Sequence, residues 1–269
     1  MRRGFTLIEA VAVVGIVCFL FAILSSAMRG GLSSARQMQC VANLRQLVGA
    51  NYLYANDNGG FFAPASSRNN NTRWHGQRKS RNAPYDSRMG YLSPYFCQGE
   101  GITGTPNPPN YYTDDPLRGT GRELECKEFL SYSLNAGSFE KGAGCYGYNA
   151  TYIGGSEGSM FRGTHMDTLT DPSRTIMFAD TAFSWGGSGS IQEYPFAEPF
   201  RSVRADGSLG DGLIPSIHFR HNGKANIAWA DGHVTCEEPS ELYSDSLDVG
   251  WIGDRYNNGP WNSRQVRQQ

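Results

Sequence analysis

The sequence predicts an α+β fold in which one long N-terminal helix packs on a mainly antiparallel β-sheet domain with long loops. Residues 5–28 are almost entirely apolar, and residues 29–57 continue with apolar side chains at helical spacing. The second half of the chain instead carries short apolar runs separated by turn-forming dipeptides. The 33 glycines and 13 prolines indicate many turns, which argues against a helix bundle for most of the chain.

The segment 5–28 is long enough to cross a bilayer as a helix, since about 20 residues span the hydrocarbon core. Arg2 and Arg3 precede it, so the positive-inside rule places the N-terminus in the cytoplasm and the rest outside. The alternative is a secretory signal peptide, and residues 24–27 form a loose match to its small-residue cleavage site.

Glu9 is the one charge inside this apolar segment. A carboxylate among apolar side chains costs several kcal/mol in a membrane, and such residues usually have a partner and a function. A free α-amino group on a neighbouring subunit would be a suitable partner, provided that the chain is cut just upstream of Glu9.

The N-terminal residues RRGFTLIE, 2–9, resemble the processing signal of type IV pilins and type II secretion pseudopilins. The resemblance implies that prepilin peptidase cuts between Gly4 and Phe5 and that the new N-terminus on Phe5 is methylated. Glu9 then becomes the fifth mature residue, which in that family pairs with the N-terminal amine of a neighbour during assembly. It also implies a pilin-like fold with four segments: a leader peptide at 1–4, a transmembrane and polymerisation helix at 5–28, its amphipathic continuation at 29–57, and a globular β-rich exported domain at 58–269.

Further motifs are similar to those of a bacterial group of pilin-like proteins with a C-terminal H-x9-DG motif. Residues 40–47 read CVANLRQL, residues 146–149 read YGYN, and the segment 171–180 ends in Asp180. His221 precedes Asp231-Gly232 at the spacing of the motif. The resemblance therefore assigns family positions, which we expect to be structural, to Cys40, Asn43, Leu44, Gln46, Tyr148, Asn149, Asp180, His221, Asp231 and Gly232.

A three-stranded antiparallel meander explains the H-x9-DG spacing without any chemistry. Residues 216–221 lead into Asn222-Gly223, the strongest short hairpin signal. The predicted return strand is 225–230, and Asp231-Gly232 forms a second tight turn before 233–236.

The motifs in the sequence do not indicate an enzyme. His221, Asp231, His233 and Asp180 could supply a base and its orienting partner, but no nucleophile elbow, HExxH, P-loop or dinucleotide motif is present. We therefore assign no catalytic and no metal-binding residue and expect no cofactor. A structural calcium ion remains open, because Gly- and Ser-rich loops carry the possible oxygen ligands Asp206, Asp211, Asp245, Asp248 and Asp254.

Six cysteines occur at positions 18, 40, 97, 126, 145 and 236, and none forms a CxxC pair. This spacing argues against a structural zinc site. Pairing cannot be read from the sequence, and we take Cys126 with Cys145 as a working guess.

The sequence thus predicts a structural filament subunit, a pilin or pseudopilin, that assembles with itself and with other pilin-like subunits. The expected partners are prepilin peptidase and the cytoplasmic membrane, and the net charge of −1 argues against nucleic acid. The predicted location is the cytoplasmic membrane, single-pass with the N-terminus inside, and then a periplasmic or extracellular filament. The alternative function is a membrane-anchored or filament-displayed module that binds glycan or another surface polymer.

Overall fold

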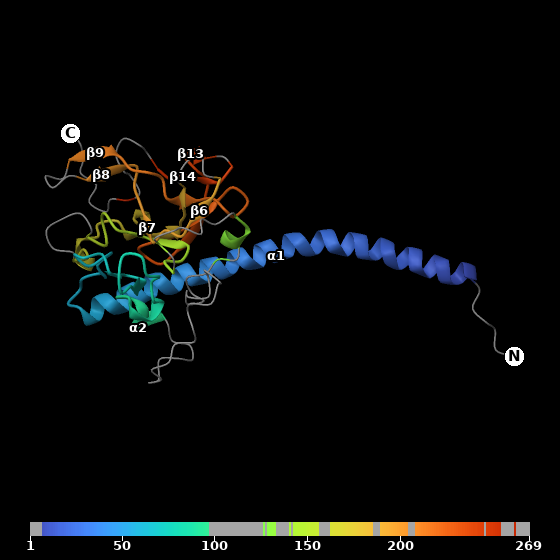
Figure 1. Cartoon of the computed structure of the whole chain (residues 1–269), viewed down its shortest axis with the longest axis horizontal. Coiled ribbons are helices and arrows are strands. Elements are labelled where there is room, and N and C mark those ends of the chain that lie inside the picture. The colour runs from blue at the N-terminus through green and yellow to red at the C-terminus, as the bar shows by residue number, and fades with distance from the viewer. Residues whose placement is uncertain are drawn as a thin grey trace.

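A 51-residue helix, α1 (Leu7–Asp57), is the largest element of the protein. Its second half lies against the β-rich part of the chain, whereas its first half projects away from it (Figure 1). The computed structural model describes residues 7–96, 126, 128–132, 140, 142–155, 162–184, 189–203, 208–244, 246–253 and 261, apart from the side chains of 22–30, 96, 203 and 244.

Fourteen short strands make up the described β-structure. They are β1 (Thr72–Arg73), β2 (Gly76–Gln77), β3 (Tyr146–Asn149), β4 (Ile176–Asp180), β5 (Phe183–Ser184), β6 (Ile191–Gln192), β7 (Phe196–Ala197), β8 (Arg201–Val203), β9 (Leu209–Gly212), β10 (Ile217–His218), β11 (Ala225–Trp229), β12 (Val234–Glu237), β13 (Glu241–Ser244) and β14 (Val249–Trp251). The other α-helix in the described part of the chain, α2 (Ser93–Phe96), is short and packs on α1.

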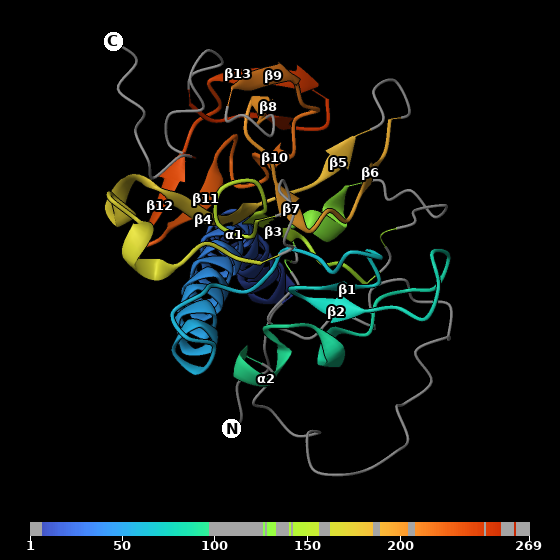
Figure 2. The same ribbon diagram turned by 90° about the vertical axis from the view of Figure 1, so that its left-hand side faces the viewer.

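The strands form five separate sheets in the described part of the chain. The largest has the order β12-β11-β4-β3-β7, and its β3–β7 pair is parallel. A three-stranded sheet has the order β10-β14-β13, and the pairs β1-β2, β5-β6 and β8-β9 stand alone. Figure 2, which views α1 nearly end-on, shows β11, β4 and β3 beside the helix and β8, β9 and β13 farther from it.

The predicted fold class is therefore wrong. The protein is mostly β, with few helices and many small sheets, rather than a half-membrane helix packed on one mainly antiparallel sheet. The strands are only two to five residues long, and nine of the fourteen described strands lie outside the largest sheet, in four smaller ones. Among the described residues, no helix has the length and apolar character needed to cross a membrane, so the predicted single-pass anchor is not supported.

The predicted C-terminal meander is also only partly correct. Asn222 and Gly223 adopt positive φ angles of 54° and 76°, as a tight hairpin turn requires, and β11 pairs with β12 as expected. The residues before the turn do not join this sheet, however, because β10 pairs with β14. The other neighbour of β11 is β4, which arrives from a distant part of the sequence.

Buried amides attach α1 to the largest sheet. The Asn51 side chain donates to the Tyr148 hydroxyl over 3.0 Å and accepts from the backbone N–H of Ala63 over 2.9 Å. The Asn43 side chain lies 3.3 Å from the Tyr146 hydroxyl. Because these groups are buried, each bond satisfies polar atoms that would otherwise be costly to remove from water. The helix is thereby held in one register over β3.

A buried carboxyl, Glu193, joins the end of β6 to the loop before β3. It accepts backbone hydrogen bonds from Gly142 over 2.6 Å and from Gly144 over 3.2 Å. Burial raises the pKa of Glu193 to about 7, against the opposing effect of these backbone bonds. The fold therefore favours the neutral carboxyl.

This shift predicts a pH-dependent loss of stability. Because the folded pKa lies above the ordinary value of 4.5, the contribution of Glu193 is fully present below that value and is lost as the pH rises through about 7. Relative to Glu193→Gln, we expect the wild-type free energy of unfolding to fall by on the order of 2 kcal/mol between about pH 5 and pH 8. Urea unfolding at both pH values measures it, and Glu238→Gln, at an exposed site, should keep the wild-type profile. Equal profiles for wild type and Glu193→Gln would contradict the assignment.

Candidate functional site

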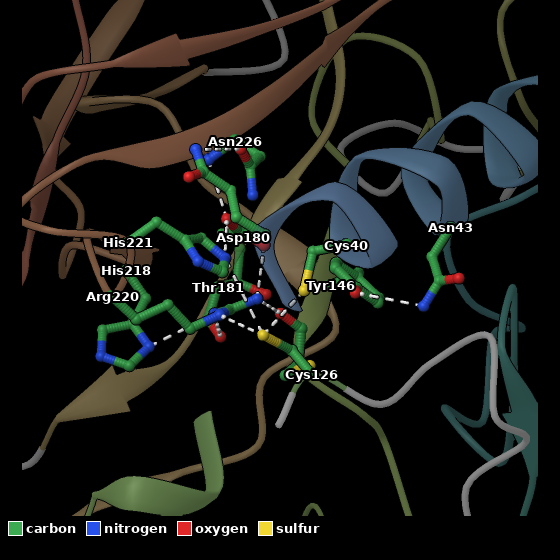
Figure 3. A network of polar contacts seen from close by, with 12 residues as sticks. Cys40, Asn43, Cys126, Tyr146, Asp180, Thr181, His218, Arg220, His221 and Asn226 are labelled. Carbon is green, nitrogen blue, oxygen red and sulfur yellow. Dashed lines mark hydrogen bonds and ion pairs between the residues drawn. The ribbon is translucent and has the colours of Figure 1, made fainter. Parts of the chain in front are cut away.

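A buried arginine, Arg220, is the centre of a polar network between α1 and the largest sheet (Figure 3). All five of its N–H donors point at partners. Nε lies 3.2 Å from Cys126 Sγ, Nη1 lies 3.3 Å from both the Thr181 carbonyl and His218 Nδ1, and Nη2 donates to the Cys145 carbonyl and to Asp180. A guanidinium can be buried at acceptable cost when its charge is paired and its donors are satisfied.

Asp180, the last residue of β4, supplies the compensating charge. One oxygen accepts from Arg220 over 2.5 Å, and the other accepts from the backbone N–H of Asn226 over 2.7 Å and lies 3.3 Å from His221 Nε2. Neither side chain of the Asp180–Arg220 pair is exposed to solvent. The pair therefore ties β4 to the start of β11 and to the segment between β10 and β11.

The surroundings favour the charged forms of the His221 imidazole and the Cys126 thiol. Burial lowers the pKa of His221, but the hydrogen bonds to Asp180 and Cys126 outweigh it and raise the pKa to about 9. Hydrogen bonds from the Cys145 and Cys40 thiols, with the Arg220 charge, lower the pKa of Cys126 well below its ordinary value. In return, the pKa values of Cys40 and Cys145 are raised, by the bond to Cys126 and by burial respectively.

The sulfur atoms of Cys40, Cys126 and Cys145 lie together in this network. Cys40 Sγ lies 2.9 Å from Cys126 Sγ, and the Cys145 thiol also bonds to Cys126. Cys40, Cys126 and Cys145 are all free thiols in the described chain, so the structure shows no Cys126–Cys145 disulfide and our working guess for the pairing is not supported. Cys40, Cys126 and His221 form the one group of three or more potential metal ligands that the described residues bring within 4.8 Å of one another.

Several positions of the family resemblance meet here, and others do not. Cys40, Asp180 and His221 converge on the network, although they come from α1, β4 and the turn before β11. Asp231 lies elsewhere, in an exposed turn, 2.5 Å from His233 Nδ1. Gly232 completes that turn with a φ angle of 93°. The H-x9-DG motif is thus divided between a buried histidine and a solvent-facing turn.

The remaining family positions have separate environments. Leu44 is fully buried in the main apolar cluster, together with Tyr148. Asn149 donates to the backbone carbonyls of Ile176 and Trp261 over 2.8 and 3.0 Å. Gln46 faces solvent. Of the processing and assembly residues, Glu9 lies exposed in the first turn of α1, whereas Gly4 and Phe5 lie outside the described residues.

The possible calcium ligands do not gather around a site in the described chain. Asp206, Asp245 and Asp254 lie outside the described residues. Asp248 accepts a 2.5 Å hydrogen bond from the Tyr132 hydroxyl. Asp211 lies in β9. No calcium site is therefore assigned.

Chemically, Cys126, His221 and Asp180 contain the groups of a cysteine nucleophile, a base and an orienting acid. His221 Nε2 lies 3.8 Å from Cys126 Sγ, but the same nitrogen contacts Asp180. An orienting acid acts through the other ring nitrogen. Cys126 and His221 are each only 2% exposed, so a substrate has no approach to the thiol. The arrangement fits a structural network better than a catalytic one.

Sequence reasoning did not single out Arg220, and it did not place Cys126 beside Cys40. No local signal indicated the burial of Arg220, because polar and apolar side chains alternate in the stretch SIHFRH, 216–221, which places Arg220 on the polar face of a strand. Comparison with known proteins finds no matching family model, curated protein or solved structure. The arguments for function therefore rest on this chain itself.

The network makes a sharp prediction for Asp180→Asn. The substitution leaves the Arg220 charge buried without its carboxylate, and breaking such a pair costs about 3–5 kcal/mol. Asp231→Asn is the matched control, because its exposed pair with His233 should change stability by less than about 1 kcal/mol. Chemical unfolding of both variants measures the difference. Losses of similar size would show that Asp180 does not hold the fold together.

Proposed function

We propose that this chain is a structural subunit, a pilin or pseudopilin, of a type IV pilus-like or type II secretion-like filament. The observation that carries the proposal is the exposed apolar surface on the first part of α1, which projects from the β-rich domain (Figure 1). Leu7 is 84% exposed and Phe19 is 67% exposed, and eight further large apolar side chains between positions 8 and 21 are also exposed. Apolar surfaces of this extent mark sites of interaction.

The pattern of these side chains favours further helices as the occupants. They lie on every side of α1, at Val11, Val13, Val14, Ile16 and Val17 among other positions. A helix that is apolar all round is buried on all sides in its working state. Identical helices from neighbouring subunits would provide that environment in the core of a filament, and the β-rich domains would be displayed outside it. Burial of the apolar surface, at roughly 25 cal/mol per Å², would drive assembly without covalent chemistry in the subunit.

Glu9 gives the proposed packing its register. Glu9 is the one charged residue between positions 7 and 21, and a carboxylate inside an apolar helix cluster needs a positive partner. Cleavage after Gly4 would create an α-amino group on Phe5 four residues upstream of Glu9. The RRGFTLIE resemblance supports this step, and pairing with the amine of a neighbour would align adjacent subunits. The filament would lie in the periplasm or outside the cell.

The pairing is tested by Glu9→Ala in the full chain expressed with its assembly machinery. We expect N-terminal processing to continue and the yield of filaments to fall by at least about tenfold, as loss of roughly 1.4 kcal/mol per contact would cause. Mass spectrometry follows processing, and sedimentation with electron microscopy follows filaments. A processed variant that assembles at the wild-type level would refute the pairing.

The apolar surface is tested separately by Val14→Asp. A carboxylate at this exposed position leaves the isolated subunit intact but would be buried among apolar side chains in the filament. We therefore expect loss of filaments without loss of the folded domain, monitored by its thermal melting. Gln46→Asp is the matched control, because Gln46 is exposed on the half of α1 that packs on the domain. Equal assembly of both variants would rule out α1 as the polymerisation surface.

One observation favours the second candidate, a glycan-binding module. A cleft of about 400 Å³ is lined by residues 212–215, which end β9 and follow it, and by Phe200, Arg201, Tyr243 and Trp251. The rings of Phe200 and Trp251 stack there with their centroids 4.4 Å apart. Tyr243 lies edge-on to Trp251 and is 49% exposed. Aromatic rings that combine an apolar face with a polar edge suit ligands such as sugars.

A glycan array probed with the full chain in detergent tests this candidate. Tyr243→Ala should reduce binding by about tenfold, an energy within the range for one aromatic contact. Leu242→Ala should leave binding unchanged, since this exposed neighbour does not line the cleft. Absence of binding by the wild-type chain, or equal loss in both variants, would reject the module.

A further inference from the structure

The sulfur cluster lies where α1 leaves the β-rich domain. Cys40 is 1% exposed and is the first buried residue of α1 among those whose side chains are described. Cys126, which precedes a short 3-10 helix at Phe129–Ser131, reaches this point from far along the chain. We propose that Cys40 and Cys126 are oxidised to a disulfide that fastens α1 to the domain at this junction.

The distance between the two sulfur atoms supports a covalent link. Their separation of 2.9 Å is closer than non-bonded sulfur atoms normally approach, and a disulfide of about 2.05 Å requires a further movement of only about 0.9 Å. Both side chains are buried, so a bond formed here would be shielded from external thiols. The link would also join positions far apart in sequence, where a disulfide constrains the unfolded chain most.

The surroundings of Cys126 make its sulfur the nucleophile. Arg220 Nε donates to it over 3.2 Å, and His221 Nε2 lies 3.8 Å away. These positive groups favour the thiolate, which is the reactive form. Cys126 attacks one sulfur of an external disulfide oxidant, RSSR, and releases RS⁻. Cys40 then loses its proton to RS⁻ and attacks Cys126 Sγ, which releases the second RS⁻. Two electrons pass to the oxidant, which becomes two thiols after protonation. Because both sulfur atoms are buried in the folded domain, the external oxidant reacts with Cys126 before α1 docks, and Cys40 attacks Cys126 Sγ as docking brings the two sulfur atoms together.

A zinc site is the main competing interpretation of the same residues. Tetrahedral zinc with Zn–S bonds of about 2.3 Å holds its sulfur ligands about 3.8 Å apart, farther than the separation of Cys40 and Cys126. Arg220 also brings a positive charge directly against Cys126, which opposes the binding of a cation there. The geometry thus favours the disulfide.

Cys145 is the competing partner for Cys126. A Cys126–Cys145 link would stay within the β-rich part of the chain, whereas a Cys40–Cys126 link would anchor the helix. In the proposed filament, any force on the first half of α1 would reach the domain at this junction. A covalent bond there would prevent the helix from peeling away from β3 and β11.

The experiment maps the thiols of the full chain in two settings. In cells, free thiols are alkylated during an acid quench, and the purified chain is digested without reductant. In vitro, the chain is reduced in urea and refolded in detergent with a reduced and oxidised glutathione buffer. We expect a linked peptide pair containing Cys40 and Cys126, with alkylated Cys145, in both settings. The linked pair should disappear in Cys40→Ser and persist in Cys145→Ser.

The two settings separate this proposal from the proposed function. Formation in cells rests on the export that the filament proposal implies, whereas formation in vitro does not. A linked pair in vitro with reduced thiols in cells would therefore count against export and leave the disulfide standing. A Cys126–Cys145 link, full alkylation after refolding, or one equivalent of zinc by elemental analysis would overturn the disulfide, as would persistence of the linked mass in Cys40→Ser.

Discussion

The buried pair of Asp180 and Arg220 is the interaction on which the arrangement of this domain depends. Arg220 directs all five donors at groups from four segments of the chain, and Asp180 balances its charge while accepting from the backbone of Asn226. Because unpaired donors and charges are expensive in a protein interior, these segments have one mutually compatible placement. The three-stranded sheet, which His218 of β10 joins to this network, is thereby fixed in relation to β4 and β11 of the largest sheet.

The helix α1 divides into two parts with different physical roles. Its second half is amphipathic, with buried Leu44 and Leu47 facing the domain and polar residues facing solvent. Its first half exposes apolar side chains and carries Glu9 in the first turn. The transition falls near Cys40, where the thiol cluster and the Arg220 network lie. The Asp180–Arg220 network and the proposed Cys40–Cys126 disulfide thus lie at the junction where a force on the projecting half of α1 would act on the domain.

Local signals in the sequence predicted the parts of the fold that depend on local physics. Helical periodicity predicted packing of the helix around Leu44 and Leu47, and Asn222-Gly223 predicted a turn with positive φ angles. The sheet arrangement could not be predicted in this way, since the alternation in 216–221 fits a strand equally well in either sheet. Pairing of β10 with β14 rather than β11 depends on contacts between residues distant in the chain.

The candidate site was only partly predictable for the same reason. Asp180 and His221 were singled out individually, but nothing local indicates that they share Arg220 and Cys126. Their grouping requires the sheet order β11-β4-β3 and the position of Cys40 on α1.

The mass of the mature N-terminal peptide tests the central claim of a processed filament subunit most directly. The proposal predicts that the mature chain begins at Phe5 and carries one added methyl group on its amine. A mature chain that begins at Met1 would contradict the proposal. Cleavage near residue 27, as expected for a secretory signal peptide, would also contradict it.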